Sequence, residues 1–139
     1  MSAARRKKFK RFVLDTNVWI SYVINGELEW LARYVVQNRL LIYGSPLLLA
    51  EIKKVLQYAR VKKLLNLSIA SYVNVITSFV LLKEDAPVTI NSPDPDDNFI
   101  FSLAISNNAK AIVCGDKSLL NWKTSPVKVI SKKDFESLY

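Results

Sequence analysis

The predicted architecture depends on the segment Phe12-Val13-Leu14-Asp15, where a run of apolar residues ends directly in an acid. Consecutive large apolar residues are typical of a short strand that is buried on both faces, as the strands of parallel sheets are. Leu40 to Tyr43 and Ala111 to Cys114 repeat this pattern further along the chain. The sequence therefore predicts short buried strands separated by long connecting segments.

Helical patterns fill the segments between these strands. From Thr16 to Asn38 apolar residues recur at helical spacing with a break at Asn25-Gly26, which predicts two consecutive helices. Ser45-Pro46 and Asp94-Pro95 each place a capping residue before a proline, which signals the start of a helix. The other predicted elements are helices at 47–57, 60–65, 68–82, 95–108, 117–122 and 132–138, and strands at 87–90 and 127–130.

Short strands that alternate with helices predict an α/β fold, with three α/β/α layers and a central parallel sheet of about four or five strands. The length of 139 residues fits a single domain. Residues 1–10 carry many like charges and few apolar side chains, which indicates a basic mobile arm. We therefore expect one domain over residues 11–139.

Charge is distributed unevenly along the chain. Lysine and arginine number 20 against 12 aspartates and glutamates, for a formal net charge of +8. Six of these cations precede the first acid, Asp15, so the fourteen that follow nearly balance the twelve acids. The excess of positive charge therefore belongs mainly to the start of the chain.

Two scarce residue types exclude whole classes of chemistry. The chain has no histidine, which excludes catalytic triads, histidine-ligated zinc and a histidine general base. The single cysteine, Cys114, excludes an internal disulfide and suits a reducing compartment, so we expect a cytoplasmic protein. No apolar stretch approaches the ~20 residues that a membrane span requires. Hydrolytic chemistry would have to use carboxylates, lysines, hydroxyls or an oxygen-ligated metal.

Acids follow two of the predicted strands. Asp15 comes directly after its strand, and Asp116 follows another strand after a single glycine. The carboxyl ends of parallel strands share one edge of the sheet, where α/β proteins bind ligands. The alternative is that each acid only caps the helix that follows it. Glu51, flanked by Ala50 and Ile52, either faces a cleft or pairs with Lys54 on an exposed helix face.

A turn between residues 92 and 98 is dense in acids. Asp94 can cap a helix there, and Asp96 and Asp97 suit the positive end of its dipole, so the pattern selects none of them for chemistry. Several carboxylates at one edge would repel one another unless a cation neutralised them. Oxygen ligands without histidine or cysteine favour Mg²⁺ or Mn²⁺, and such a site suits phosphodiester hydrolysis.

Four segments, in order, resemble those of PIN-domain proteins, and most closely the VapC-like ribonucleases that are toxins of prokaryotic toxin–antitoxin pairs. The segments are Val13-Leu14-Asp15-Thr16-Asn17-Val18, Ser45 to Ile52 around Glu51, Asp94-Pro95-Asp96-Asp97-Asn98, and Cys114-Gly115-Asp116-Lys117-Ser118-Leu119-Leu120. The resemblance implies a Mg²⁺- or Mn²⁺-dependent endoribonuclease that cuts single-stranded RNA.

The resemblance also implies roles for particular residues. By position, Asp15, Glu51, Asp97 and Asp116 would be the acidic quartet that holds the metal, with Asp96 as a possible alternative ligand. Asn17 and Ser118 would support the site. Ser118 stands where many relatives carry another acid, and Cys114 stands where many carry serine or threonine. Ser118 and the crowded turn at Asp94–Asp97 are consistent with an alternative, a PIN-like module that binds RNA or protein with weak or no catalysis.

Positively charged residues near the predicted site are candidates for RNA binding: Lys53, Lys54, Arg60, Lys62, Lys63 and Lys117. Their other reading is a solvated helix face. Trp19 and Tyr22 are candidates for stacking on bases, with core packing as the other reading. The implied partners are single-stranded RNA, an antitoxin protein and a second copy of the chain, and we expect no membrane contact. A third hypothesis is a different phosphoryl-handling α/β domain in which a strand-end aspartate accepts phosphate.

Overall fold

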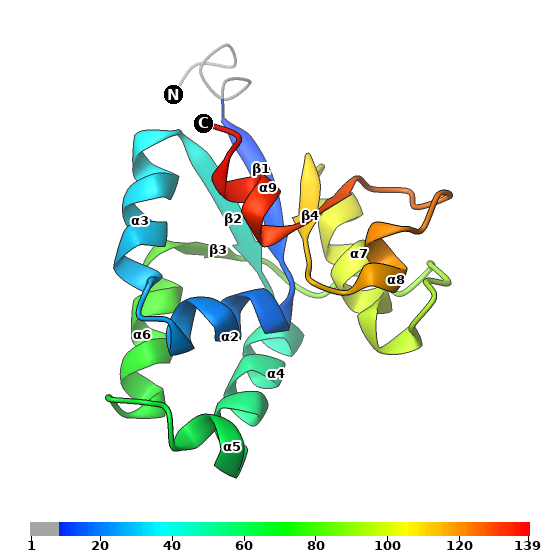
Figure 1. The fold of residues 1–139 in the computed structure, drawn as a ribbon. Coiled ribbons are helices and arrows are strands. Elements are labelled where there is room, and N and C mark those ends of the chain that lie inside the picture. The colour runs from blue at the N-terminus through cyan, green and yellow to red at the C-terminus, as the bar shows by residue number, and fades with distance from the viewer. Residues whose placement is uncertain (1–8) are drawn as a thin grey trace.

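The computed structural model describes residues 9–139. Residues 1–8 of the predicted basic arm therefore lie outside the described residues, and Lys10 begins the first strand. A parallel sheet of five strands in the order β3-β2-β1-β4-β5 runs through the domain (Figure 1). The strands are β1 (Lys10–Leu14), β2 (Leu40–Gly44), β3 (Val80–Leu82), β4 (Ala111–Val113) and β5 (Val129–Ile130). Every pairing is parallel, so the predicted central sheet is confirmed.

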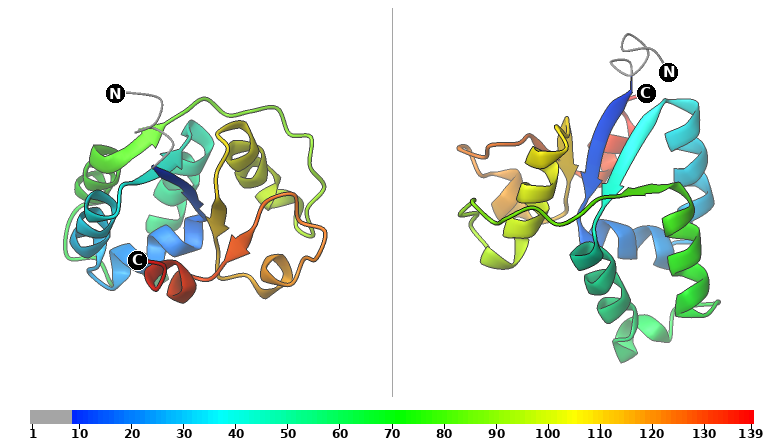
Figure 2. Two further views of the ribbon diagram at one scale, coloured as in Figure 1. Left: turned by 90° about the horizontal axis from the view of Figure 1, so that it is seen from above. Right: turned by 180° about the vertical axis from the view of Figure 1, so that it is seen from behind.

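Helices cover both faces of this sheet. They are α2 (Thr16–Ile24), α3 (Leu28–Gln37), α4 (Pro46–Leu56), α5 (Ala59–Lys62), α6 (Ile69–Phe79), α7 (Asn98–Ser106), α8 (Lys117–Leu120) and α9 (Lys132–Glu136), with a 3-10 helix η1 (Pro95–Asp97). Viewed from above, α2, α3 and α9 lie on one side of the strands and α4 and α7 on the other (Figure 2). The predicted three-layer α/β/α architecture is therefore confirmed. Among the described helices, none combines the length and the apolar character that spanning a bilayer requires.

Two predicted elements are wrong. The helix predicted at 68–82 ends at Phe79, and its last three residues form the edge strand β3, which pairs with β2 from Ile42 to Gly44. The strand predicted at 87–90 is absent, because that segment is extended chain without sheet pairing. The edge strand β3 thus lies earlier in the sequence than the strand predicted at 87–90.

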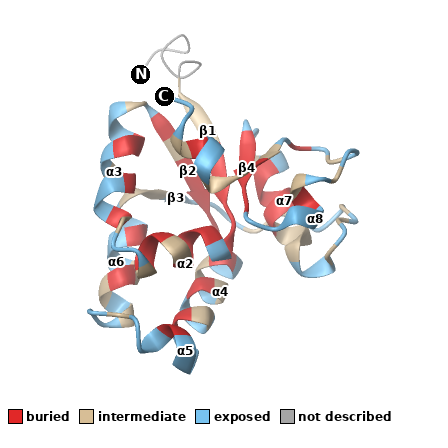
Figure 3. Ribbon diagram, viewed as in Figure 1, coloured by how far each residue is buried: buried red, intermediate tan, exposed pale blue. Residues whose placement is uncertain are grey.

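The centre of the sheet brings two chain segments together at one edge. Phe12, Val13 and Leu14 are fully buried, as the red core of Figure 3 shows. Leu14 pairs with Val113, and the backbone N–H of Asp15 donates to the carbonyl of Val113 at 2.9 Å. The residues that follow β1 and β4 are therefore neighbours at the carboxyl edge of the sheet.

The close approach of β2 and β3 requires a glycine at position 44. A Cβ atom at Gly44 would lie 2.8 Å from Cγ1 of Val80, whose branched side chain has little freedom to move. We expect Gly44→Ala to lower the free energy of unfolding by about 1–3 kcal/mol, the usual cost of overpacking. Urea denaturation measures this, with Gly115→Ala as the control because no atom lies within 4 Å of a Cβ added there. Equal losses in the two variants would contradict this account of the sheet edge.

Candidate functional site

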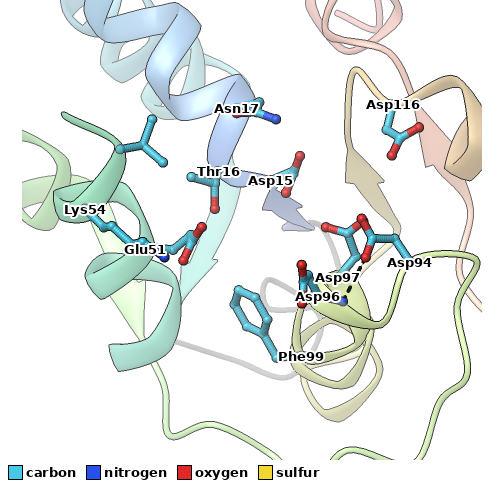
Figure 4. A pocket seen from close by; sticks show the side chains of 11 residues that line it. Asp15, Thr16, Asn17, Glu51, Lys54, Asp94, Asp96, Asp97, Phe99 and Asp116 are labelled. Atoms are coloured by element: carbon cyan, nitrogen blue, oxygen red, sulfur yellow. Dashed lines mark hydrogen bonds between the residues drawn. The ribbon is translucent and has the colours of Figure 1, made fainter. Parts of the chain in front are cut away.

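Acidic side chains from four separate segments face one cavity at the carboxyl edge of the sheet (Figure 4). The cavity has a volume of about 340 Å³. The acids that line it are Asp15, Glu51, Asp94, Asp96, Asp97 and Asp116. All four members of the predicted quartet are thus brought to a shared cavity, and the remaining lining residues are Thr16, Asn17, Lys54, Val55 and Phe99.

Asp15 is the most buried of these acids, with 8% of its surface exposed. It precedes α2, but its side chain makes no capping hydrogen bond to that helix. Asp15 thus occupies the N-cap position of α2 without a side-chain capping hydrogen bond, so capping does not by itself account for the carboxylate. Burial raises the pKa of its carboxyl group, and the negative charge of Asp116 adds to this effect, while the backbone N–H groups of Thr16 and Asn17 oppose it. The carboxylate therefore lies at the carboxyl edge of the sheet, where it lines the cavity.

Asp116 combines a cap with a place in the cavity. Its Oδ1 accepts hydrogen bonds from the backbone N–H and the hydroxyl of Ser118, both at 2.8 Å, and so caps α8. Its Oδ2 is not used by these bonds. Capping and ligand binding are therefore compatible at this residue, and Ser118 fixes the direction in which the carboxylate points.

Cys114 lies behind the two strand-end acids. Its thiol is fully buried, accepts a hydrogen bond from the backbone N–H of Asp116 at 3.2 Å and faces Oδ2 of Asp15 at 3.9 Å. Burial raises the pKa of the thiol to about 12, so the sulfur keeps its proton at neutral pH. Cys114 is therefore a weak donor toward Asp15 rather than a reactive thiolate.

The acid-dense turn supplies two side chains that face Asp116. One carboxylate oxygen from each of Asp94, Asp97 and Asp116 lies within 4.8 Å of the other two. Asp94 also caps η1, because its Oδ1 accepts a hydrogen bond from the backbone N–H of Asp96 at 3.0 Å. Asp96 lines the cavity but is exposed and does not belong to this group of three. The turn thus presents Asp94 together with Asp97.

Glu51 reaches the cavity from α4, on the wall opposite the turn (Figure 4). The helix begins directly after β2, where the side chain of Ser45 caps it by accepting from the backbone N–H of Leu48 at 3.2 Å. Ion pairs between described residues involve Glu27, Glu29 and Glu136, and none of them joins Glu51 to Lys54. The reading of Glu51 as a partner of Lys54 on an exposed face is therefore not supported, and the cleft reading is.

Burial and the surrounding carboxylates raise the pKa of Asp97. The pKa of Asp97 rises to about 7, first because the group is partly buried and then because Asp15, Asp94, Asp116 and Asp96 are negatively charged. Bringing these acids together costs electrostatic free energy that a bound cation would offset. The electrostatics of the cavity thus favour a positively charged ligand.

A hard divalent cation fits the donor atoms that the cavity offers. Every candidate ligand is a carboxylate oxygen, the donor type that Mg²⁺ and Mn²⁺ prefer. Bonds of about 2.0–2.1 Å to Mg²⁺ put oxygens on opposite sides of the ion about 4.2 Å apart. The oxygens of Asp94, Asp97 and Asp116 lie within 4.8 Å of one another and would have to move inward, since adjacent ligands of one such ion are only about 3.0 Å apart. Asp15 and Glu51 line the same cavity outside this group of three, so the fit to an oxygen-ligated ion rests on the chemistry of the donor set.

The predicted cationic residues do not share one position. Lys54 lines the acidic cavity, whereas Lys53 lines a separate groove of about 300 Å³ with Ile69 and Val73 of α6. Arg60, Lys62 and Lys63 are exposed on and after α5. Lys117 is exposed at the start of α8 and lies outside the lining of the cavity.

The aromatic residues predicted to stack on bases are buried. Trp19 is 1% exposed and packs against Phe79, and Tyr22 is fully buried with its hydroxyl donating to Glu136 at 2.8 Å. The stacking prediction is therefore wrong for both, and core packing is correct. Asn17, predicted to support the site, is exposed and lines the cavity.

Four residues of the cavity were not among the predicted site residues: Thr16, Val55, Asp94 and Phe99. The sequence predicts a cap at Asp94 and leaves open which acid of the turn is the ligand, and it does not single out the other three. Phe99 gave a weak signal, because a residue three positions after Asp96 lies on the same side of a starting helix. The capping pattern at Asp94 accounts for only one of its carboxylate oxygens, so it gave no sign that the other is available to the site.

Comparisons with known proteins identify the family of the chain and structures with the same fold. A family model described as PIN domain matches residues 11–118. Among curated proteins, none matches this sequence. The solved structures that share the fold include the following two. VapBC2 from Rickettsia felis, bound to a DNA fragment from their promoter, is 17% identical with a TM-score of 0.60, covering 87% of this chain and 98% of that one. PAE2754 from Pyrobaculum aerophilum is 14% identical with a TM-score of 0.54, covering 91% and 94%.

Proposed function

The chain belongs to the PIN-domain family, and on that premise we propose that it is a divalent-metal-dependent endoribonuclease acting on single-stranded RNA. The observation that carries the proposal is the convergence of carboxylates from four separate segments on one cavity. Asp15, Glu51, Asp97 and Asp116 form the proposed catalytic and metal-holding set, as the resemblance implies. The position of Asp94 beside Asp97 and Asp116 supports adding it to this set in preference to Asp96.

The cofactor in this proposal is Mg²⁺ or Mn²⁺. When bound, the ion supplies charge neutralisation at the phosphoryl group and activates a water molecule for attack. The protein's own task is to hold the carboxylates in place. Ser118 donates to Oδ1 of Asp116 and leaves Oδ2 unused by these bonds, and Oδ1 of Asp94 likewise accepts the capping bond from Asp96. Each acid then offers one oxygen in a fixed direction, and the Asn17 amide at the cavity can orient a phosphate oxygen or water.

The substrate needs a path past this acidic centre. Lys54 is the cation that lines the cavity, and it forms no ion pair with a described carboxylate. We place a phosphate of the RNA beside Lys54, with Arg60, Lys62, Lys63 and Lys117 as outer contacts along the strand. Lys53 faces the groove beside α6, so we leave it out of this path.

A matched pair of lysines tests this path. In the Asp15→Asn background, where cutting is expected to be slow, Lys54→Met should weaken binding of single-stranded RNA and reduce the log–log salt slope by about 0.7, as loss of one phosphate contact requires. Lys53→Met, one residue away and equally charged, should change neither value. Fluorescence anisotropy with labelled RNA at several salt concentrations measures both quantities, and identical slopes for the two variants would count against the path.

We also propose that the protein is the toxin of a toxin–antitoxin pair, that an antitoxin protein holds it inactive, and that it forms a homodimer in the cytoplasm. The four motifs resemble those of such toxins, and the fold is shared with VapBC2 from Rickettsia felis. Leu64 and Leu67, 50% and 59% exposed between α5 and α6, offer apolar surface to a partner. Light scattering of the purified chain, alone and co-expressed with the product of a neighbouring small reading frame, tests both associations.

Incubation of the purified protein with labelled single-stranded RNA and Mn²⁺, with and without EDTA, tests the nuclease proposal. Internal cleavage that EDTA abolishes supports it. Tight binding without cutting would instead favour the alternative of a binding module. Neither binding nor cutting, tested over several RNA sequences, would contradict the proposal.

A further inference from the structure

One wall of the acidic cavity carries no acid. Between Glu51 on α4 and Asp96 on η1, the ring of Phe99 points toward the hollow (Figure 4). Lys54 and Val55, one helical turn after Glu51, line the cavity from α4. Binding a hydrated ion does not require an aromatic ring beside the carboxylates. This wall therefore suits a part of the substrate that the carboxylates do not hold.

Phe99 differs from the apolar residues that follow it on α7. Ile100 and Phe101 are 2% and 0% exposed, and Phe101 packs edge-on against Trp122 inside the core. Phe99 is only half-buried, so it packs against the core on one side and leaves part of its ring at the cavity. The ring is thus anchored by packing and still has a face to offer.

Resting on the proposed nuclease function, we propose that Phe99 is a substrate-positioning residue that stacks on the base next to the scissile phosphate. An aromatic ring binds any base by its flat face, and phenylalanine has no hydrogen-bonding group with which to read one. Lys54, which lines the same cavity from α4, holds the neighbouring phosphate, so the substrate is contacted both at a base and at its backbone. The predicted contact therefore does not depend on which base of the RNA is present.

The same contact accounts for a preference for single strands. In a duplex both faces of a base are covered by its neighbours, so a protein ring can reach a face only when the base is unstacked. Phe99 therefore selects RNA that is already unpaired, without any contact to the Watson–Crick edge of the base.

A fluorescent base reports this stacking directly. A short oligouridylate with one 2-aminopurine is mixed with the protein and Mn²⁺ in a stopped-flow instrument, so that binding is recorded before cutting. The wild-type protein should quench the 2-aminopurine fluorescence. Phe99→Leu keeps an apolar side chain of similar size without a ring, and should lose the quenching and bind about 5- to 150-fold more weakly. Phe99→Tyr should restore both.

The matched control is Phe79→Leu, the same substitution at another half-buried phenylalanine, which packs on Trp19 away from the cavity lining. It should bind and quench as the wild type does. Mn²⁺ affinity, measured by calorimetry, should be equal in wild type and Phe99→Leu, because the ring holds no ion. A loss of Mn²⁺ affinity in Phe99→Leu would show that the substitution disturbs the carboxylates.

Failure of the stacking proposal and failure of the nuclease proposal give different results in these experiments. If the wild type cuts RNA and Phe99→Leu binds, quenches and cuts equally well, the stacking role is overturned while the nuclease function stands. If the wild type binds and quenches without cutting, and Phe99→Leu loses the quenching, the stacking role stands while the nuclease function fails.

Discussion

Replacing Asp97 with asparagine is expected to make the metal-free protein more stable at pH 8 by about 2 kcal/mol, which raises Tm by roughly 6 °C. The pKa of Asp97 is raised to about 7, so above that pH folding brings an already ionised carboxylate into a partly buried, negatively charged cavity at a cost. A shift of this size corresponds to at most about 4 kcal/mol, and screening by water at this half-buried site lowers the figure.

The sign of the pH dependence follows from the raised pKa. Below about pH 4 the group is protonated in both the folded and the unfolded protein, and the substitution should change little. Between about pH 4 and pH 7 the wild type progressively loses stability relative to Asp97→Asn, and above pH 7 the difference is constant. Urea denaturation in EDTA at pH 4, 6 and 8 measures the difference.

Loss of a favourable helix charge is the competing effect. Asp97 precedes α7 and makes no capping bond there, so its interaction with the helix dipole is worth about 0.3–1 kcal/mol, less than the repulsion. Asp134→Asn is the control, because Asp134 is exposed in the first turn of α9 and experiences only the dipole effect. Saturating Mn²⁺ should reverse the ranking, since a ligand at 100 times its Kd adds about 2.7 kcal/mol to the wild type. Equal stability of wild type and Asp97→Asn at pH 8 in EDTA would contradict the crowding of charge.

Replacing Asp15 with asparagine is expected to lower the rate of RNA cleavage at least about a hundredfold. Outer-shell partners of a metal ligand already cost 10- to 100-fold when removed, and Asp15 is proposed as a ligand itself. The substitution keeps the shape of a nearly buried side chain and removes only its charge, so the fold should be retained. Single-turnover cleavage of labelled RNA measures the rate.

A control variant in the same assay checks that the cleavage comes from this protein and not from a contaminating nuclease. Asp134→Asn, purified in parallel, should cut at the wild-type rate, which identifies the activity as that of this protein and not of a contaminant. Unchanged melting in EDTA, or a small increase, should accompany the loss of activity in Asp15→Asn. Cleavage by Asp15→Asn at the wild-type rate would remove this residue from the catalytic set.

Much of the fold could be predicted because the local signals agree with the tertiary structure. The strands β1, β2 and β4 are buried on both faces, so their apolar runs stand out, and Ser45 and Asp94 cap helices where the cap-and-proline pattern placed them. The strand ends then fix the positions of Asp15 and Asp116 without further information. The edge where the site lies follows from topology alone.

The two wrong elements, the helix predicted to reach residue 82 and the strand at 87–90, depend on strand pairing in the folded sheet, which the local sequence does not show. Val80, Leu81 and Leu82 continue a helical stripe in the sequence, but β2 offers them an unpaired edge and they become β3. The following segment then crosses toward η1, as Figure 2 shows, and finds no strand to pair with. Asp85 in that segment accepts a hydrogen bond from the backbone N–H of Leu47 at 3.0 Å, which ties it to the start of α4 instead.

The site could be predicted as a set of segments but not atom by atom. Three acids within four residues give no basis for choosing among Asp94, Asp96 and Asp97, because the choice depends on which carboxylate turns toward Asp116. The same limit applies to the lysines at 53 and 54, which α4 points into different grooves. Chain topology is encoded locally, whereas side-chain direction at a turn depends on the surrounding structure.

Calorimetric titration with Mn²⁺ is the most direct test of the central claim, that these carboxylates act together as one cation site. The wild type should show saturable binding, Asp96→Asn should bind almost as tightly, and Asp94→Asn should bind at least about tenfold more weakly, although asparagine still caps the helix. Failure of the wild type to bind Mn²⁺, or equal affinity in wild type, Asp94→Asn and Asp15→Asn, would contradict the claim.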